Sequence, residues 1–201
     1  MHPGQSGPSV SRGVEVRAPS FFARVSTPFG TMSIVWWEAA TGPRVRQILL
    51  ARSGSPAAST VAAIFPDARD ATCPPIVDLA RDLQRFLTGK PVVFDLKRIA
   101  LERCGAFQRR VLLAEHGIPR GRVSTYGRMA RHLGVPGGAR AVGRALAQNP
   151  FPIVIPCHRA VCANGGLGGY QGGSRMKRAL LEMEGVRFTE KGNVRMDRVH
   201  Y

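Results

Sequence analysis

Two short helical patterns joined by a glycine-rich turn most strongly limit what this chain can fold into. They lie in "RVSTYGRMARHLGVPGGARAVGRALAQNP", residues 122–150, and "GVPGG" separates them. A helix, a tight turn and a second helix of small residues form the outline of a helix-turn-helix. Other pairs of antiparallel helices share this outline, so the residues of the second helix matter.

One face of the second helix carries almost no side-chain bulk. Arg140 stands at its N-terminal end and Arg144 lies one turn later. A small face permits close approach to a surface, and arginine binds phosphate oxygens. Close packing against another helix would use the same small residues equally well. These residues are Gly138, Ala139, Ala141 and Gly143.

The charge of the chain favours a polyanion as partner. Its 201 residues hold 29 Lys plus Arg against 13 Asp plus Glu, a formal net charge of +16. Such a field attracts nucleic acid. A composition bias of the genome toward arginine would also produce a basic chain. Combined with the small face of the second helix, the charge favours DNA.

The first part of the chain predicts a small α/β domain over residues 20–101. The stretch "FFARVSTPFGTMSIVWWEA" has two β-rich arms around a turn, and "PRVRQILLA" follows as a third strand, which together predict an antiparallel meander. The segment "PPIVDLARDLQRFLTGK" then places an apolar stripe on one helix. The stripe consists of Ile76, Leu79, Leu83, Phe86 and Leu87. Residues 1–19, rich in Gly, Pro, Ser and Arg, predict a flexible tail.

The second part, residues 102–188, predicts a mainly helical domain, with 189–201 as a C-terminal tail. The segment "FQRRVLLAEHGIPRG" is helical up to its first glycine. Its apolar side is expected to consist of Phe107, Val111, Leu112 and Leu113. The two short helical patterns described above follow this helix.

An apolar run of six residues is followed directly by a cysteine, Cys157. "FPIVIP", residues 151–156, is β-branched and bounded by prolines, so it predicts a buried extended strand with Cys157 at its end. The thiolate is the nucleophilic form, so a group must accept the proton. His158 is adjacent but points to the opposite face of an extended chain, and a bridging water or a turn would connect the two. Glu182 or, as the preferred choice, Glu184 would orient the imidazole.

A Cys-His pair alone more often belongs to an ordinary buried loop, but the longer pattern is specific. "VSTYGRMA", "GGARAVGRALAQNP", "IPCHRAV", "GGLGGYQGG" and "KRALLEMEG" occur in this order between residues 122 and 185. This half of the chain closely resembles the O6-alkylguanine-DNA alkyltransferases, also called methylated-DNA–protein-cysteine methyltransferases. The N-terminal part resembles them weakly.

The resemblance implies a fold: an N-terminal domain with a ribonuclease-H-like antiparallel sheet and a winged-helix-like, helix-turn-helix catalytic domain. It implies that Cys157 accepts the alkyl group, with His158 as base through water and Glu184 behind it. Tyr126 would help to rotate the nucleotide and contact the guanine, and it could donate a proton.

The resemblance also implies DNA-binding and pocket roles. Arg140 would fill the gap left by the flipped base, on a helix that presents Ala139, Gly143 and Arg144 to DNA. Asn149 would tie the helix-turn-helix to the active-site strand, and Tyr170 would wall the guanine pocket. Two positions depart from the pattern of relatives. Gln171 replaces a small hydroxyl residue, which leaves the alkyl-group preference open, and Ala160 replaces a bulkier aliphatic residue whose contact runs through the main chain.

The expected reaction is a stoichiometric, single-turnover transfer from O6-alkylguanine in double-stranded DNA, with O4-methylthymine as a second candidate substrate. A guanine lesion inside the stack is reached only by flipping the nucleotide. No cofactor and no metal are expected. A zinc deaminase would need H-x-E and P-C-x-x-C, and Ala160 stands where the second cysteine would be.

Two other functions stay open: a lesion sensor that lacks transfer, against which the intact PCHR argues, and a helix-turn-helix regulator, for which no regulatory domain is visible. We expect a cytoplasmic monomer. All four cysteines are expected to be reduced, and neither a signal peptide nor a run of about 18 apolar residues occurs. Cys73 and His116 lack the paired spacing of a metal site.

Overall fold

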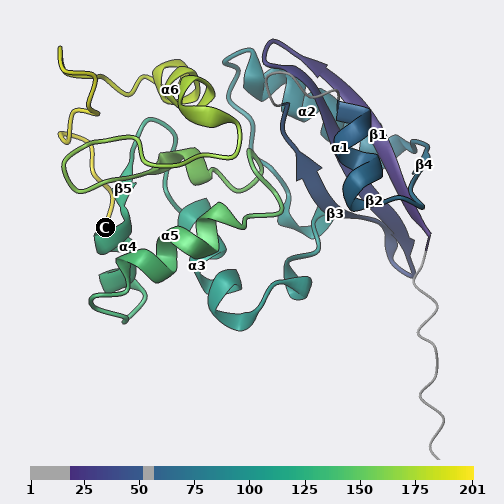
Figure 1. The fold of residues 1–201 in the computed structure, drawn as a ribbon, viewed down its shortest axis with the longest axis horizontal. Coiled ribbons are helices and arrows are strands. Elements are labelled where there is room, and N and C mark those ends of the chain that lie inside the picture. Colours follow the sequence, from purple (N-terminus) through teal and green to yellow (C-terminus); the bar gives the residue numbers. More distant parts are fainter. Residues whose placement is uncertain (1–18, 52–56) are drawn as a thin grey trace, which may run out of the picture.

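The computed structural model describes residues 19–51 and 57–201, which excludes most of the predicted N-terminal tail (Figure 1). The predicted meander is present: β1 (Ser20–Thr27), β2 (Gly30–Ala39) and β3 (Gly42–Leu49) pair antiparallel. A short β4 (Arg69–Asp70) joins the other side of β1 in parallel, giving the order β3-β2-β1-β4. The sheet is therefore mixed, whereas the sequence predicted an antiparallel one.

Two helices pack on this sheet. The first, α1 (Ala57–Ile64), contacts β2 and β3, and the second, α2 (Pro74–Leu87), contacts β1. The stripe predicted for α2 is buried in full. From Met32 to Trp36 every residue of β2 is buried, and because successive residues of a strand alternate between faces, both faces of β2 are covered.

The second half holds four helices: α3 (Ala106–His116), α4 (Tyr126–His132), α5 (Ala139–Ala147) and α6 (Gly173–Met183). Three 3-10 turns, η1 (Leu96–Arg98), η2 (Leu101–Arg103) and η3 (Cys157–Arg159), lie between helices. Strands β5 (Ser124–Thr125) and β6 (Ala160–Val161) pair in parallel. The helices α4 and α5 contact each other, as the helix-turn-helix outline predicted. The ribonuclease-H-like and winged-helix-like topologies stay predictions.

Two details of the sequence reading were wrong. Leu113 was assigned to the apolar side of α3 but is 46% exposed, and the buried face includes Glu115 instead. Residues 151–156 are buried, but they form a compact turn and no strand: the Ile155 N–H donates to the Phe151 carbonyl, and Ile153 has φ of 75°. The run bridges to itself between Pro152 and Ile155, so part of its backbone hydrogen bonding is satisfied locally.

The two predicted domains share one hydrophobic core. A single buried cluster runs from Ala23 in β1 to Leu180 in α6. The Ile48 N–H of β3 also donates to the Pro150 carbonyl at 2.8 Å, just before the turn that carries Cys157. The site in the second half therefore rests directly on the first half.

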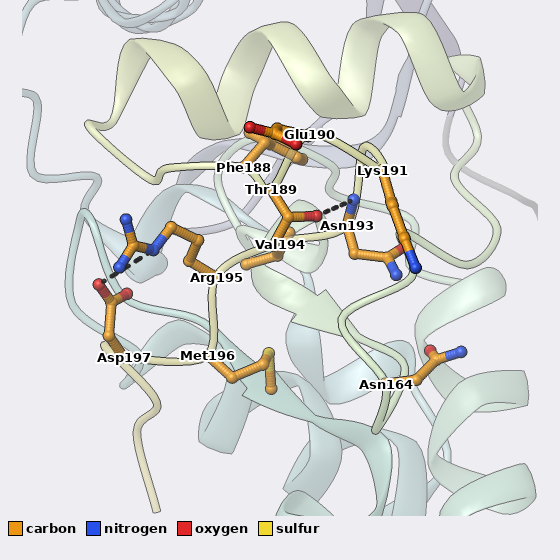
Figure 2. A pocket seen from close by; sticks show the side chains of 10 residues that line it. All are labelled: Asn164, Phe188, Thr189, Glu190, Lys191, Asn193, Val194, Arg195, Met196 and Asp197. Atoms are coloured by element: carbon orange, nitrogen blue, oxygen red, sulfur yellow. Dashed lines mark hydrogen bonds and ion pairs between the residues drawn. The ribbon is translucent and has the colours of Figure 1, made fainter.

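The segment predicted as a C-terminal tail packs on the second half. Phe188 and Val194 form an antiparallel bridge, and Val199 pairs in parallel with Val123. This segment and Asn164 line an open cavity of about 930 Å³ (Figure 2), where Asp197 pairs with Arg195. Within the described ranges, no helix is both long enough and apolar enough to cross a membrane.

Candidate active site

One buried amide holds the Cys157 thiol. Asn149, two residues beyond the end of α5, is 1% exposed. Its Nδ2 donates to the Ile155 carbonyl at 3.1 Å and to Cys157 Sγ at 3.2 Å, while its Oδ1 accepts from the Phe151 N–H at 2.9 Å. These three hydrogen bonds join the end of α5 to the segment that carries Cys157.

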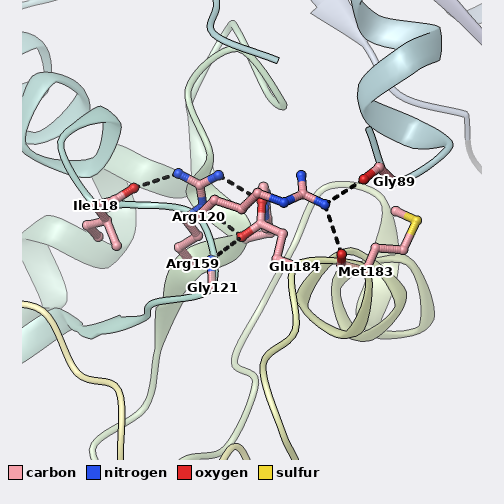
Figure 3. Close-up of polar contacts among 8 residues, drawn as sticks. Gly89, Ile118, Arg120, Gly121, Arg159, Met183 and Glu184 are labelled. Carbon is pink, nitrogen blue, oxygen red and sulfur yellow. Dashed lines mark hydrogen bonds and ion pairs between the residues drawn. The ribbon is translucent and has the colours of Figure 1, made fainter. Parts of the chain in front are cut away.

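His158 and Glu184 form a buried pair. His158 Nε2 lies 3.0 Å from Glu184 Oε1 at the end of α6. Arg159 binds the same carboxylate twice, through Nε to Oε2 at 2.9 Å and Nη2 to Oε1 at 2.8 Å (Figure 3). Burial alone would raise the pKa of Glu184, but the hydrogen bonds and charges of His158 and Arg159 lower it to about 2.

The second imidazole nitrogen of His158 is left to accept a proton. Burial lowers the pKa of His158 despite the hydrogen bond to Glu184, so the ring is neutral near pH 7. An ionised Glu184 requires the proton on Nε2, which leaves the lone pair on Nδ1. Nδ1 is buried without a hydrogen-bond partner among the described residues. The neutral ring can therefore accept a proton at Nδ1.

The thiol needs such a base. Burial raises the pKa of Cys157 to about 12, although the hydrogen bond from Asn149 acts in the opposite direction. At neutral pH the sulfur is protonated in this state. Because only the thiolate is a good nucleophile, activation depends on transfer of the proton.

A pocket of about 410 Å³ opens onto Cys157. Four predicted residues line it together with the thiol: Tyr126, Gly143, Tyr170 and Gln171. Asn149 and Ala160 are not among its lining residues, although both were predicted there. Asn149 lies beside the sulfur, and Ala160 is fully buried with its carbonyl bound by Lys177 at 2.7 Å.

Tyr126 is fixed from two sides. It is the first residue of α4, where the Thr125 side chain accepts the Arg128 N–H and caps the helix. Gly168 approaches its hydroxyl so closely that a Cβ there would lie 2.9 Å from Tyr126 Oη, and φ at Gly168 is +68°. Burial, followed by the neighbouring Cys162, Glu115 and Cys157, raises the pKa of Tyr126 to about 12. The hydroxyl is therefore protonated at neutral pH.

The loop after β6 forms another part of the pocket wall, through Gly169, Tyr170 and Gln171. The Tyr170 ring meets the His158 ring edge-on with centroids 6.4 Å apart. Gln171 Nε2 donates to the carbonyls of Ala147 and Asn149, at 3.1 and 2.7 Å, so it ties this loop to the end of α5.

Three buried ionisable residues were given no role by the sequence analysis: Arg159, which binds Glu184 as described above, Lys177 and Glu115. Lys177 is fully buried, and its Nζ donates to the Leu167 and Gly169 carbonyls of the pocket loop as well as to Ala160. Glu115 is also fully buried, and neither carboxylate oxygen has a hydrogen-bond partner among the described residues. A signal existed: Lys177 precedes Leu180 and Leu181 by three and four positions, the spacing of one helix face.

The exposed side of α5 carries the predicted arginines. Arg140 and Arg144 are exposed and Ala139 is half-buried. Gly143 instead faces Tyr126, because a Cβ there would lie 3.9 Å from that ring. The small face is thus divided between the outer surface and the pocket. In the part of the chain that the structure describes, no three His, Cys, Asp or Glu side chains gather as a metal site would require.

Comparisons with known proteins place the second half of the chain in one family. Residues 106–186 match the family described as "6-O-methylguanine DNA methyltransferase, DNA binding domain". Curated relatives named methylated-DNA–protein-cysteine methyltransferase include one from Methanothermobacter thermautotrophicus, 47% identical over 111 residues, and one from Salmonella typhimurium, 53% identical over 107. These matches cover 55% and 53% of this chain and span 62% of each relative's length.

Solved structures extend the likeness over most of the chain. The Mycobacterium tuberculosis OGT in complex with DNA aligns with a TM-score of 0.67 and 32% identity, covering 82% of this chain and 92% of that one. The O6-methylguanine-DNA methyltransferase of Pyrococcus kodakaraensis aligns with a TM-score of 0.61 and 25% identity, covering 83% and 100%. The chain therefore belongs to the methylated-DNA–protein-cysteine methyltransferase family.

Proposed function

We propose that this protein repairs DNA by moving an alkyl group from O6-alkylguanine to its own Cys157. The observation that carries the proposal is the thiol itself: Asn149 holds it at 3.2 Å, it opens into a pocket, and a neutral His158 backed by Glu184 follows it in the chain. The named relatives act on methylated DNA, which supports the same substrate class here.

The transfer is a displacement at the alkyl carbon. The thiol proton passes to His158 Nδ1 through a water, and Glu184 stabilises the imidazolium that results. The sulfur bonds to the alkyl carbon as the bond from that carbon to O6 breaks. The departing guanine takes a proton from the Tyr126 hydroxyl, and the proton held by His158 then returns to the Tyr126 oxygen, so both side chains end neutral.

Access to the lesion requires a flipped nucleotide. The pocket of about 410 Å³ is within the range of small-molecule sites, and Tyr170 offers an aromatic wall for a base. Arg140, exposed at the start of α5, is placed by the proposal in the gap left in the duplex, with Arg144 near the backbone phosphates.

The product is a thioether, so each molecule acts once as a suicide acceptor. A thioether has no carbonyl for water to attack and no good leaving group. O4-methylthymine is a second candidate substrate, because it also carries its alkyl group on a base-edge oxygen. We further propose that the protein is a monomer and lies in the cytoplasm.

The test is to mix the protein with a duplex containing O6-methylguanine and to measure its intact mass. Transfer adds one methyl group, located on Cys157 by peptide mapping, and the Cys157→Ala variant gains none. Unchanged mass in the wild-type protein with retained binding to the lesion would instead identify a sensor. Repeating the reaction with an O4-methylthymine duplex decides the second substrate.

A further inference from the structure

The C-terminal ends of two helices, one from each half of the molecule, meet at the guanidinium of Arg120. Its Nη2 donates to the Gly89 carbonyl, just beyond α2, at 2.9 Å and to the Met183 carbonyl, the last residue of α6, at 2.8 Å (Figure 3). Carbonyls at a helix C-terminus lack intrahelical partners and carry partial negative charge. A cation placed between two such ends stabilises both and fixes their separation.

The same side chain reaches His158 through an aromatic ring. The Arg120 Cζ lies 5.6 Å from the centroid of Phe86, a buried residue in the last turn of α2. That ring meets the His158 ring at 6.0 Å with an interplanar angle of 61°. Arg120 therefore orders an aromatic side chain of the first half that packs directly against the imidazole.

The residue after Arg120 contacts the other member of the pair. Gly121 has φ of +76°, and a Cβ on it would lie 2.8 Å from the Glu184 carbonyl oxygen. Its N–H also points to Glu184 Oε2 at 3.4 Å. Residues 120 and 121 thus contact the end of α6 through the Met183 carbonyl and the Glu184 carboxylate, and Gly121 leaves no room for a side chain beside the Glu184 carbonyl.

The charge of Arg120 is not used in a surface ion pair. Among the ion pairs of the described residues, none includes Arg120, and its Nη1 is buried without a hydrogen-bond partner. The observed contacts of the guanidinium are therefore the two carbonyls and the Phe86 ring.

We propose that Arg120 is a positioning residue that fixes the Glu184–His158 pair by joining the end of α6 to the end of α2. This role rests on the proposed function. The first half of the chain would then support the reaction through α2, although none of its side chains reacts. Loss of the two hydrogen bonds frees the end of α6, and Glu184 then stabilises the His158 imidazolium less well. The Cys157 proton becomes harder to remove, so a higher pH is needed for the same rate.

The experiment compares Arg120→Met, Arg120→Lys and a control, Arg178→Met, in the full chain. Methionine keeps an apolar stem over Phe86 but removes both hydrogen bonds, and lysine keeps the charge. Arg178 also lies over an aromatic ring and binds Glu182, but on the outer side of α6. The measurements are the single-turnover rate of methyl gain from an O6-methylguanine duplex between pH 6 and 9, the final fraction methylated and the affinity for undamaged DNA.

We expect Arg120→Met to react about tenfold more slowly, with the midpoint of its pH profile displaced upward and an unchanged final fraction and DNA affinity. The rate and the pH midpoint of Arg120→Lys should lie between those of Arg120→Met and the wild type. Both quantities should be unchanged in Arg178→Met. The other ionisable groups that act on His158, namely Glu184, Arg159 and Lys177, remain in every variant.

An unchanged midpoint in Arg120→Met, or an equal effect of Arg178→Met, overturns the proposal. If Arg120→Met does not fold, the midpoint of Arg120→Lys decides in the same way. A wild-type protein that gains no methyl group would instead contradict the proposed function, so the two failures are distinct.

Discussion

At the scale of single residues, the Cys157 thiol is neutral in the resting protein. Burial holds the pKa of Cys157 near 12, while the neighbouring imidazole is neutral and a carboxylate of pKa about 2 lies behind it. A buried charge is costly unless it is paired, so the resting thiol avoids ionisation. The Asn149 amide, which donates to Cys157 Sγ, stabilises the thiolate more than the thiol once the proton leaves.

This arrangement predicts a double effect for Asn149→Ala. The change removes the hydrogen bond to Cys157 and leaves the buried Phe151 N–H and Ile155 carbonyl without this partner. We expect a fall in the transfer rate of about tenfold or more and a loss of about 2 kcal/mol in the free energy of unfolding. Urea unfolding and single-turnover kinetics measure the two effects. Gln148→Ala, one residue earlier and exposed, is the control.

Because the pKa of Glu184 is lowered in the folded protein, we expect the free energy of unfolding to depend on pH. Its folded pKa of about 2 lies below the ordinary 4.5, so its contribution is full above about pH 4.5 and is lost as the pH falls toward 2. The full contribution is about 3 kcal/mol. Denaturant titrations at several pH values should therefore show wild type and Glu184→Gln converging on acidification. Curves that stay parallel would contradict the pairing.

At the scale of elements, α3 carries a buried acid that opposes folding at neutral and higher pH. Burial raises the pKa of Glu115 to about 8, and nearby Lys177 and Arg159 offset this only in part. The helix nevertheless forms, because its remaining buried face of Val111, Leu112 and Ala114 packs into the shared core.

Glu115→Gln should stabilise the protein at alkaline pH. A raised folded pKa means that the wild type loses stability as the pH climbs from about 4.5 through 8, by on the order of 4 kcal/mol. The amide variant lacks this loss. Thermal unfolding at pH 5 and pH 8.5 should show the variant gaining on the wild type as the pH rises, whereas the exposed Glu182→Gln should not. Equal slopes for both variants would refute the prediction.

For α5, Arg140→Ala should slow repair in duplex DNA more than repair of the free base. Arg140 is exposed at the start of the helix and outside the pocket lining, so it can act on the duplex but not on a base already free. The rates of Cys157 alkylation by an O6-methylguanine duplex and by free O6-benzylguanine measure the difference. Arg85→Ala on α2 is the control, and equal losses on both substrates would argue against a flipping role.

At the scale of the whole molecule, two properties matter for the proposed function: the net charge and the buried core that the two halves share. The formal charge of +16 attracts DNA without regard to sequence. The larger buried cluster and the contacts of Arg120 join the two halves, so the proposed DNA surface with Arg140 and Arg144 and the pocket with Cys157 are held in one frame.

The affinity for undamaged duplex should fall steeply with salt. Each phosphate neutralised by Lys or Arg contributes a slope of about 0.9 to the plot of log affinity against log salt concentration. Arg144→Ala should lower that slope by about one if Arg144 meets a phosphate. Fluorescence anisotropy between 50 and 300 mM salt gives the slope, and an unchanged slope would remove Arg144 from the interface.

The sequence by itself determined the meander, the buried stripe of α2, the two helices around "GVPGG" and the family. These depend on periodicity, turn residues and motif order, which are local properties of the chain. It was wrong for "FPIVIP", which has the composition of a strand but folds into a turn, with Ile153 at a positive φ and the Ile155 N–H bound to the Phe151 carbonyl.

Only the tertiary structure decided which groups meet. The sequence named Glu184 as the preferred partner of His158 and Glu182 as the alternative, but it gave no sign of Arg120, which lies 31 and 63 positions from the carbonyls that it joins. The burial of Glu115 and Lys177 likewise comes from the packing of α3 and α6 around η3. Hydrogen bonding and desolvation depend on distances in space, which the order of residues along the chain does not specify.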